Sequence, residues 1–427
     1  MRDRPANPKL LRGTASGHRD NWYSYYAGFS ANFVADYLRM LRPRDARLLL
    51  DPWSGSGTAL VEGLRAGVNA AGIDLNPAMV IVSKARLLHQ SVVESLLPLA
   101  LELTEAAPAV CASNDPLKMW FRTRSAGYWR SIEQSISRHL VPHHASDLAI
   151  PGNVSALSSL AAFYYVALFK ALRRYTRPFA SRNPTWVKVP KDHRRRVDPS
   201  WKRVSDTFID EVSGLADLVS QNGFHSDRGL TGTVTLGDAR ALPIPSETVD
   251  LVISSPPYCT RIDYAVATLP ELAVLGLDRG ERFRKLRDSL TGSTTIRTLR
   301  PETDRNWGDV CMTVLDQVKA HPSQASRRYY LPQFVQYFSD LFIALGEIRR
   351  VLVQGGTAVL VVQDSLYKDV HIDLAAVVAE MALHHNLIVA ARHDYVNGRS
   401  MRQLNLGVRR YVQHWRPTES ALELVAA

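Results

Sequence analysis

The sequence predicts an α/β fold built on an open, largely parallel, Rossmann-like sheet. Four short apolar runs, at residues 48–51, 69–74, 233–239 and 249–253, have the length and composition of buried strands. Segments with helical apolar spacing follow the first two runs, as in parallel strands joined by crossover helices. The carboxyl ends of parallel strands form the edge where ligands bind, and polar residues stand at the ends of these runs. We therefore expect a ligand site at this edge of the sheet.

Charge is distributed unevenly along the chain. The 427 residues have an ordinary globular composition, 46% hydrophobic and 22% charged, but a formal net charge of +11. Between Lys118 and Arg203 there are 17 lysines and arginines against 4 acidic residues. An excess of this size favours a polyanionic partner for that region. The basic character therefore belongs to one part of the chain and not to the fold as a whole.

The first strand leads into a glycine-rich turn. The strand breaks at Pro52, Gly55 and Gly57 allow the backbone to turn tightly, and a helix opens at Thr58. Backbone amides at the start of a helix can receive a carboxylate or a hydroxyl-rich group. The position of the turn between a strand and a helix makes this signal stronger than glycines alone.

The second strand ends at Asp74, just before a helix predicted over residues 77–88. An acidic side chain at this point can accept hydrogen bonds from two ribose hydroxyls. The competing interpretation makes Asp74 the N-cap of the following helix. We favour the ribose interpretation because the residue follows the glycine-rich turn by one strand–helix unit.

Residues 91–229 interrupt the alternation of strands and helices. We predict helices at 91–107, 155–175 and 201–220, separated by a loop-rich basic stretch that contains aromatic residues. Cations for phosphates and rings for bases suit a nucleic-acid surface, and the alternative is a solvated charged face. The candidate nucleic-acid contacts are Arg173, Arg174, Arg177, Lys188, Lys191, Arg194, Arg195 and Arg196.

The strand at residues 249–253 runs into Ser255, Pro256, Pro257 and Tyr258. Two consecutive prolines cannot continue a sheet ladder and hold the backbone extended at the strand end. A hydroxyl, an exposed carbonyl and a flat ring suit a planar substrate with an exocyclic amine. The oxygens can accept hydrogen bonds from the amine, and the ring can stack on the base.

These motifs together resemble those of a known family. Ser-Pro-Pro-Tyr at 255–258 is similar to the catalytic motif of the amino-group DNA methyltransferases, which methylate cytosine N4 or adenine N6. Asp-Pro-Trp-Ser-Gly-Ser-Gly-Thr at 51–58 resembles their S-adenosylmethionine motif. Serine in the first catalytic position is more usual in the cytosine-N4 enzymes, so the chain is most like that type. The resemblance implies the seven-stranded sheet of class I methyltransferases, with S-adenosylmethionine as cofactor.

The resemblance also assigns roles to individual residues. It makes Ser255, Pro256, Pro257 and Tyr258 catalytic, and it implies that Asp238 contacts the adenine amine of the cofactor. An aromatic residue of the segment 22–30 would cover the methionine part of the cofactor, and the alternative for this segment is an aromatic core cluster. The expected cofactor-binding residues are Tyr26, Phe29, Asp51, Trp53, Ser54, Gly55, Ser56, Gly57, Thr58, Asp74, Leu75, Asn76, Asp238 and Ala239.

The resemblance covers the core segments and does not extend to the insertions. We expect late strands at 357–363, 387–395 and 406–415 that give the sheet an antiparallel ending. The large insertion falls between the second and third strands, which departs from the usual permutations of the family and leaves open which insertion reads sequence. The expected parts are an N-terminal arm (1–21), core segments (22–90, 230–264 and 331–417), a basic, mostly helical insertion that serves as the target-recognition region (91–229), a second insertion (265–330) and a C-terminal tail (418–427).

The expected activity is methyl transfer to N4 of a cytosine flipped out of double-stranded DNA. Three alternatives stay open: an adenine-N6 enzyme, an RNA base methyltransferase, and an inactive DNA-binding protein with the same fold. We expect Cys259 to be a small buried residue, because attack on cytosine C6 would need a cysteine directly after the proline. Direct transfer requires no metal, and His139, His143 and His144 lack partners at ligand spacing.

The sequence also bears on location and partners. Three widely spaced cysteines favour a reducing compartment. No secretory signal is recognised, and the uncharged stretch at 148–169 contains a proline and a glycine, so we interpret it as a loop and a buried helix and expect no membrane span. We expect a cytoplasmic protein, with a cognate restriction endonuclease as a candidate partner. Oligomeric state is not predicted.

Overall fold

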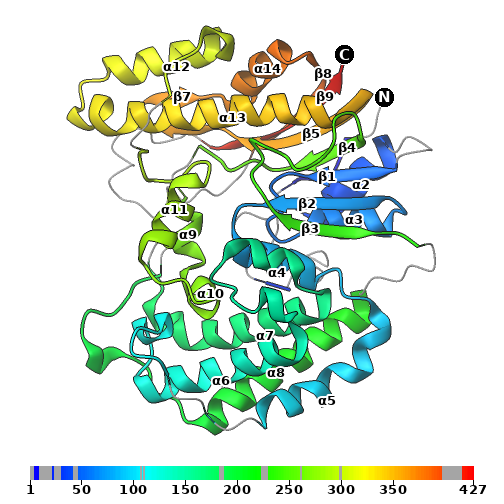
Figure 1. Cartoon of the computed structure of the whole chain (residues 1–427). Coiled ribbons are helices and arrows are strands. Elements are labelled where there is room, and N and C mark those ends of the chain that lie inside the picture. The colour runs from blue at the N-terminus through cyan, green and yellow to red at the C-terminus, as the bar shows by residue number, and fades with distance from the viewer. Residues whose placement is uncertain are drawn as a thin grey trace.

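The computed structural model describes residues 4–8, 22–23, 30–41, 47–105, 108, 111–181, 187–222, 229–259, 262–297, 301–396 and 416–427. Figure 1 shows a twisted sheet with helices on both faces and a separate helical layer beside one edge. No helix among these residues is long and apolar enough to cross a membrane.

Seven strands form the main sheet in the order β3-β2-β1-β4-β5-β9-β8. The first five in this order run parallel, whereas β9 is antiparallel to both of its neighbours. This topology confirms the predicted α/β fold, with the Rossmann-like seven-stranded sheet of class I methyltransferases. The strands are β1 (Leu48–Asp51), β2 (Asn69–Asp74), β3 (Gly232–Leu236), β4 (Val249–Ser254), β5 (Leu352–Gln363), β8 (Leu387–Val396) and β9 (Thr418–Ala426), and β6 (Ser365–Tyr367) pairs with β7 (Val370–Ile372) in a separate hairpin.

The last strand corrects the sequence analysis. Residues 418–427, assigned there to a C-terminal tail, contain β9, which lies inside the sheet between β5 and β8. The strand predicted at 406–415 falls outside the described residues. Glu419 and Glu423 make this segment look solvated, yet both side chains are buried. Glu419 accepts a hydrogen bond from a tyrosine, and Glu423 lies 3.4 Å from the Nε2 atom of His393.

The two faces of the sheet are covered by different helices. Side chains of β5 alternate, so Val359 and Val361 pack on one face while Ala358 and Leu360 pack on the other. The first face is covered by α2 (Ala31–Leu41), α3 (Thr58–Arg65) and α4 (Pro77–Ala85), and the second by α12 (Asp309–Ala320), α13 (Leu331–Val351) and α14 (Leu374–His384).

Residues between α4 and β3 form the helical layer at the bottom of Figure 1. Its central helix, α7, is buried along most of its length and packs against α4 of the core. Aromatic rings fill the layer: the ring of Trp129 lies 5.6 Å from that of Phe121 and 5.4 Å from that of Tyr175. The helices are α5 (Val93–Thr104), α6 (Thr123–Leu140), α7 (Ser159–Thr176) and α8 (Trp201–Asn222).

Three short helices lie on the left of Figure 1, between the helical layer and α13: α9 (Tyr264–Ala267), α10 (Leu269–Val274) and α11 (Glu281–Ser289). Two arginines of the helical layer fasten α10. Arg130 donates to the backbone oxygens of Val274 at 2.7 Å and of Ala273 at 3.1 Å, which satisfies the end of the helix. Arg173 binds the carboxylate of Glu271. The helical insertion is therefore joined directly to the segment that follows the Ser-Pro-Pro-Tyr motif.

Part of the predicted N-terminal arm is anchored to the core. The backbone amide of Ala6 donates to Asp36 on α2 at 2.8 Å, and the hydroxyl of Tyr395 on β8 donates to the carbonyl of Pro5 at 2.7 Å. Residues 4–8 therefore connect α2 to the edge strand of the sheet.

Candidate active site

The glycine-rich turn between β1 and α3 has the predicted form. Gly55 and Gly57 have φ angles of 47° and 78°, in the left-handed region that favours glycine. A Cβ atom on Gly57 would also lie 2.4 Å from the Oγ atom of Ser83. Only glycine fits at position 57 without moving α4. The turn therefore brings the start of α3 close to the end of β2.

Asp51 lies behind this turn. Its side chain is fully buried, and its Oδ1 atom accepts hydrogen bonds from Ser254 Oγ at 2.5 Å and from the amide of Trp53 at 3.2 Å. Burial raises the pKa of this carboxyl to about 7, although both hydrogen bonds oppose the rise. Asp51 was expected to bind cofactor, but it does not line the cavity described below. It joins β1 to β4 instead.

Asp74 stands at the end of β2, as predicted, and faces the same turn. Its carboxylate accepts hydrogen bonds from the amides of Gly55 and Asn76, both at 2.8 Å. Burial raises its pKa to about 6 against the effect of these two bonds. The N-cap of α4 is Asn76, whose side chain accepts from the amide of Ala78 at 3.1 Å. The capping interpretation considered for Asp74 therefore applies to Asn76.

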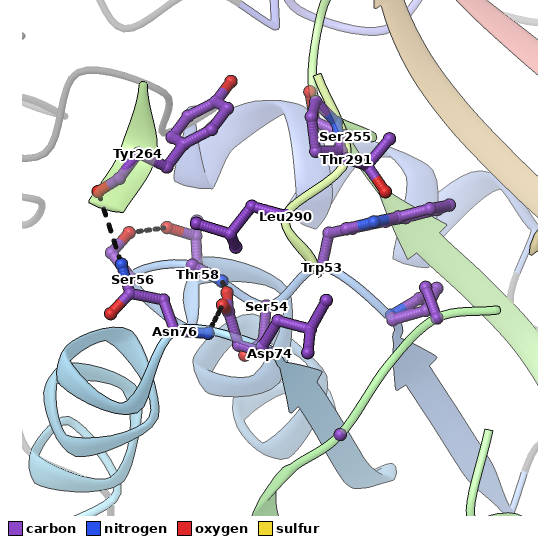
Figure 2. A pocket seen from close by; sticks show the side chains of 16 residues that line it. Trp53, Ser54, Ser56, Thr58, Asp74, Asn76, Ser255, Tyr264, Leu290 and Thr291 are labelled. Atoms are coloured by element: carbon purple, nitrogen blue, oxygen red, sulfur yellow. Dashed lines mark hydrogen bonds between the residues drawn. The ribbon is translucent and has the colours of Figure 1, made fainter. Parts of the chain in front are cut away.

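The turn, Asp74 and the Ser-Pro-Pro-Tyr motif meet at one cavity, seen in Figure 2. Its volume is about 720 Å³ including the part open to solvent, which is within the range of small-molecule sites. The lining residues come from six segments of the chain: Pro52, Trp53, Ser54, Gly55, Ser56, Thr58, Asp74, Leu75, Asn76, Gly237, Ala239, Ser255, Pro257, Tyr264, Leu290 and Thr291.

The structure separates the members of the catalytic motif. Ser255 and Pro257 line the cavity, and the Oγ atom of Ser255 donates to the backbone oxygen of Val361 at 3.1 Å. Tyr258 does not line it, and its hydroxyl donates to Glu419 on β9 at 2.9 Å. Burial and the nearby Glu419 raise the pKa of Tyr258 well above its usual value. This contact fixes the hydroxyl of Tyr258, and the stacking of its ring on the substrate stays a prediction.

Pro256 is buried. The loop that carries the Ser-Pro-Pro-Tyr motif is also held by a hydrogen bond from α13. Tyr337 on α13 donates its hydroxyl to the carbonyl of Pro257 at 2.8 Å. The hydrogen bonds from α13 and to β9 hold the carboxyl end of the Pro-Pro segment, and the bond from Ser255 to β5 holds its start. Ser255 is thereby held at the carboxyl end of β4, where the sequence placed it.

Asp238 also departs from its expected role. Its carboxylate binds the guanidinium of Arg240, with a closest distance of 2.6 Å, and the cavity is lined by the neighbouring Gly237 and Ala239. Arg240 extends to Asp340 on α13 at 2.6 Å, and Asp340 also binds Arg297 of the second insertion at 2.7 Å. Asp238 therefore belongs to a chain of charges beside the cavity and does not project into it.

Five lining residues were not among the predicted site residues. Pro52 and Gly237 lie next to predicted ones, whereas Tyr264, Leu290 and Thr291, named here the distal wall, do not. Tyr264 opens α9 directly after the N-cap Asp263, so an aspartate followed by an aromatic residue just past the motif was a usable signal. Leu290 and Thr291 follow α11 in a segment with no motif. Only the fold brings them to the cavity.

The aromatic segment before α2 lies only partly within the described residues. Tyr26 and Phe29 fall outside them. Trp22 packs edge-on against Phe163 with ring centroids 6.4 Å apart, and Tyr23 donates its hydroxyl to Glu271 at 2.5 Å. These two rings form part of the aromatic core, which was the alternative interpretation of the segment.

The predicted nucleic-acid contacts divide into two groups. Arg173 binds the fully buried Glu271 at 2.5 Å and acts as an ion-pair partner inside the molecule, which corrects its assignment to a phosphate surface. Arg174 binds Glu211 at 2.6 Å, but its side chain is 51% exposed, so its assignment stays a prediction. Arg177, Lys188, Lys191, Arg194 and Arg195 are exposed, and Arg196 is half-buried. Across the described residues, histidine, cysteine and acidic side chains form no cluster that could hold a metal ion.

Comparison with known proteins gives relatives of one kind. No protein-family model matches the chain. It is 23% identical over 385 residues to the Type II methyltransferase M.AvaI of Nostoc sp. (strain PCC 7120 / SAG 25.82 / UTEX 2576), with 84% of this chain and 77% of that protein aligned. It is 25% identical over 314 residues to the Type II methyltransferase M.BsoBI of Geobacillus stearothermophilus, with 67% of this chain and 59% of that protein aligned. The chain is a distant relative of Type II methyltransferases.

Among solved structures, the rRNA methyltransferase aviRa from Streptomyces viridochromogenes aligns over 97% of this chain and 94% of its own at 10% identity, with a TM-score of 0.31. A value this low shows no close structural relationship.

Relatedness to methyltransferases implies S-adenosylmethionine as the methyl donor. The residues of the cavity fit this molecule. Asp74 offers carboxylate oxygens to ribose hydroxyls, and the amides at the start of α3 can receive a carboxylate. Trp53 and Leu75 supply apolar surface beside them (Figure 2).

Proposed function

We propose that this protein is a site-specific DNA methyltransferase that transfers a methyl group from S-adenosylmethionine to the exocyclic N4 of cytosine in double-stranded DNA. The observation that supports this most is the single cavity lined by both Asp74 and Ser255, which brings a ribose-binding carboxylate and the Ser-Pro-Pro-Tyr motif together. The distant relationship to Type II methyltransferases agrees with it.

The chain's own residues would bind and orient the reactants. When bound, the cofactor supplies an electrophilic methyl group on a sulfonium. Ser255 Oγ, which lines the cavity, would accept a hydrogen bond from the target amine and so direct its nitrogen lone pair at the methyl group. Pro256, whose carbonyl was expected to share this role, is buried and is not among the lining residues. Protein positioning and electrostatics are then the main contributions to rate, because the leaving group is already activated.

The base must leave the duplex to reach this cavity, at a cost of a few kcal/mol. Exposed cations of the helical insertion, including Arg177, Arg194 and Arg195, would hold the backbone of the duplex during this step. Phosphate contacts of this kind fix orientation and contribute affinity without reading sequence.

The test is incubation of the whole protein with labelled S-adenosylmethionine and mixed-sequence duplex DNA, followed by mass spectrometry of nucleosides. We expect N4-methylcytosine. N6-methyladenine would keep the site and change the target base, whereas cofactor binding without any methylated deoxynucleoside would contradict the DNA assignment and make structured RNA the next substrate.

Variants of two serines assign the reaction to the site. Ser255→Ala removes the hydroxyl at the cavity and should lower kcat about tenfold to a hundredfold, the range expected from one or two hydrogen bonds. Cofactor binding should stay near the wild-type value. Ser205→Ala on α8 is the matched control, since its hydroxyl donates to the backbone of its own helix at 3.2 Å. Unchanged turnover in Ser255→Ala would refute the assignment of this residue.

A further inference from the structure

The Ser-Pro-Pro part of the catalytic loop can accept hydrogen bonds at the cavity, but its side chains donate none there. The hydroxyl proton of Ser255 is engaged in the bond to the backbone oxygen of Val361 at 3.1 Å, so toward the cavity this oxygen can only accept. Pro256 and Pro257 carry no backbone N–H group. The amine of a flipped cytosine or adenine stands beside a ring nitrogen that accepts hydrogen bonds. A donor for this ring nitrogen must therefore come from another part of the chain.

The segment 290–295, which follows α11, lies against the catalytic loop. Gly292 has a φ angle of 73°, and a Cβ atom there would lie 3.4 Å from the backbone oxygen of Tyr258 and 3.6 Å from the Cβ atom of Pro257. Because a side chain at this φ angle would be strained, the close approach favours glycine. Thr291, the preceding residue, lines the same cavity as Ser255, and Figure 2 shows both side chains. The contact at position 292 therefore brings Thr291 to the catalytic loop.

Helix α13 holds both the catalytic loop and the segment 290–295. Gln333 Nε2 donates to the backbone oxygen of Ser293 at 3.3 Å, and Gln336 Nε2 donates to that of Thr295 at 3.2 Å. Tyr337 of the same helix binds the catalytic loop through its hydroxyl. One helix therefore fixes the position of the segment relative to the loop before any ligand arrives.

The hydroxyl groups of this segment differ in what they bind. Thr294 Oγ1 donates to the buried carboxylate of Asp263 at 2.9 Å, and the hydroxyl of Ser293 donates to that of Thr295 at 3.4 Å. Within the described part of the chain, the hydroxyl of Thr291 forms no hydrogen bond. Its side chain is buried from bulk solvent and lines the cavity. Thr291 is therefore the residue of this segment whose hydroxyl is available to a ligand in the cavity.

We propose that Thr291 is a specificity-determining residue, whose hydroxyl donates a hydrogen bond to the ring nitrogen beside the target amine, N3 of cytosine, while Ser255 accepts from the amine. The inference rests on the proposed function and deepens it. One acceptor and one donor match two adjacent groups on the edge of the base that is paired in the duplex. A base without this pattern leaves a buried group unpaired and binds less tightly.

The test compares Thr291→Val and Thr291→Ser in the full chain, with steady-state kinetics on one duplex that the wild type methylates. Val keeps the shape of the side chain and removes the hydroxyl, so kcat/KM for DNA should fall about threefold to tenfold, the range expected for one hydrogen bond. Ser keeps the hydroxyl and should stay within about twofold of wild type. Cofactor affinity, measured by calorimetry, should stay within about twofold in both variants. Thr248→Val is the matched control, because Thr248 donates to the carbonyl of Pro245 at 2.9 Å in an exposed turn before β4, at the end of that strand away from the cavity.

A modified base separates this contact from a merely structural role. A duplex with a deaza analogue at the methylated position keeps the amine and has C–H in place of N3 of cytosine. The cost of flipping the analogue is the same for wild type and variant, so the double-mutant cycle isolates the contact. The ratio of kcat/KM on cytosine to that on the analogue should be about threefold to tenfold larger for the wild type than for Thr291→Val. If the product is N6-methyladenine, the same comparison uses C–H in place of adenine N1, which stands beside that amine.

Each of four outcomes would overturn the inference. These are wild-type kinetics in Thr291→Val, a Ser variant as weak as the Val variant, a loss of cofactor affinity that accounts for the whole loss of kcat/KM, and equal ratios on cytosine and analogue for wild type and variant. The third would assign Thr291 to the cofactor. Failure of the proposed function itself would look different, since the wild type would then produce no methylated deoxynucleoside and the inference would fall with it.

Discussion

The hydroxyl of Ser254 donates a 2.5 Å hydrogen bond to the carboxylate of Asp51, and both groups are buried. This bond joins the last residue of β4 to the last residue of β1, directly beneath the two loops that form the cavity. The cofactor turn and the catalytic motif therefore share one anchor. A change at either residue should affect both loops.

The first prediction concerns stability and pH. The pKa of Asp51 is raised to about 7, so between about pH 4 and pH 7 the folded protein retains a proton that the unfolded chain releases. This group should therefore lower the free energy of unfolding as pH rises through that window, by at most about 1.4 kcal/mol per pH unit. Urea unfolding at pH 5 and pH 8 measures the effect. Asp51→Asn should weaken the pH dependence of the free energy of unfolding. The same pH dependence in wild type and variant would contradict the assignment of Asp51 as the titrating group.

The second prediction concerns cofactor affinity. Hydroxyls of a ribose bind the carboxylate form of Asp74, whose pKa is raised to about 6 in the free protein. The dissociation constant of S-adenosylmethionine should therefore rise as pH falls below about 6, and approach tenfold per pH unit. Calorimetry between pH 5 and pH 8 measures it. Asp74→Asn should bind more weakly at pH 8 and show a flatter profile. An unchanged profile in the variant would exclude Asp74 as the titrating group.

The third prediction concerns the buried ion pair between the helical layer and α10. Glu271→Gln leaves Arg173 without its charge partner and should cost about 3–5 kcal/mol in the free energy of unfolding. Replacing both residues, as Glu271→Leu with Arg173→Met, should cost much less than the single change, because no buried charge is left unpaired. Urea unfolding of Glu271→Leu, Arg173→Met and the double variant gives the coupling energy. Additive effects would show that the pair does not join the two regions.

The fourth prediction concerns the exposed basic stretch. Arg194→Ala with Arg195→Ala should lower affinity for duplex DNA about equally for all sequences. It should also reduce the slope of log affinity against log salt by about 0.9 for each phosphate that the variant no longer neutralises. Fluorescence anisotropy at several salt concentrations measures the slope. Arg39→Ala is the control, since Arg39 is exposed on α2, outside the helical insertion. A slope that matches wild type would place the DNA elsewhere.

Local sequence motifs were sufficient to predict most of the site. The turn after β1, the carboxylate at the end of β2 and the serine at the end of β4 each depend on residues next to them in sequence, so their positions followed from the pattern. The largely parallel α/β sheet was predicted as well, because apolar runs alternate with helical segments in the core. Tyr264 carried a weaker local signal, an N-cap aspartate just before an aromatic residue.

The rest depended on distant partners. Glu419, far along the chain on β9, binds the hydroxyl of Tyr258. Glu271 neutralises Arg173, whose sequence neighbourhood predicted a phosphate contact. The strand β9 itself was hidden, because its glutamates look solvated unless their buried partners are known. Such contacts join residues about a hundred or more positions apart, and a single sequence does not pair them.

The chain of ion pairs that runs from Asp238 through Arg240 and Asp340 to Arg297 has a thermodynamic consequence. It joins the loop beside the expected adenine pocket to the segment that carries two of the three distal-wall residues. A ligand that moves one end of this chain of ion pairs also changes the free energy of ligand binding at the other end. Cofactor and DNA should therefore bind with heterotropic linkage. Such linkage is reciprocal. The factor by which bound cofactor changes the affinity for DNA equals the factor by which bound DNA changes the affinity for cofactor.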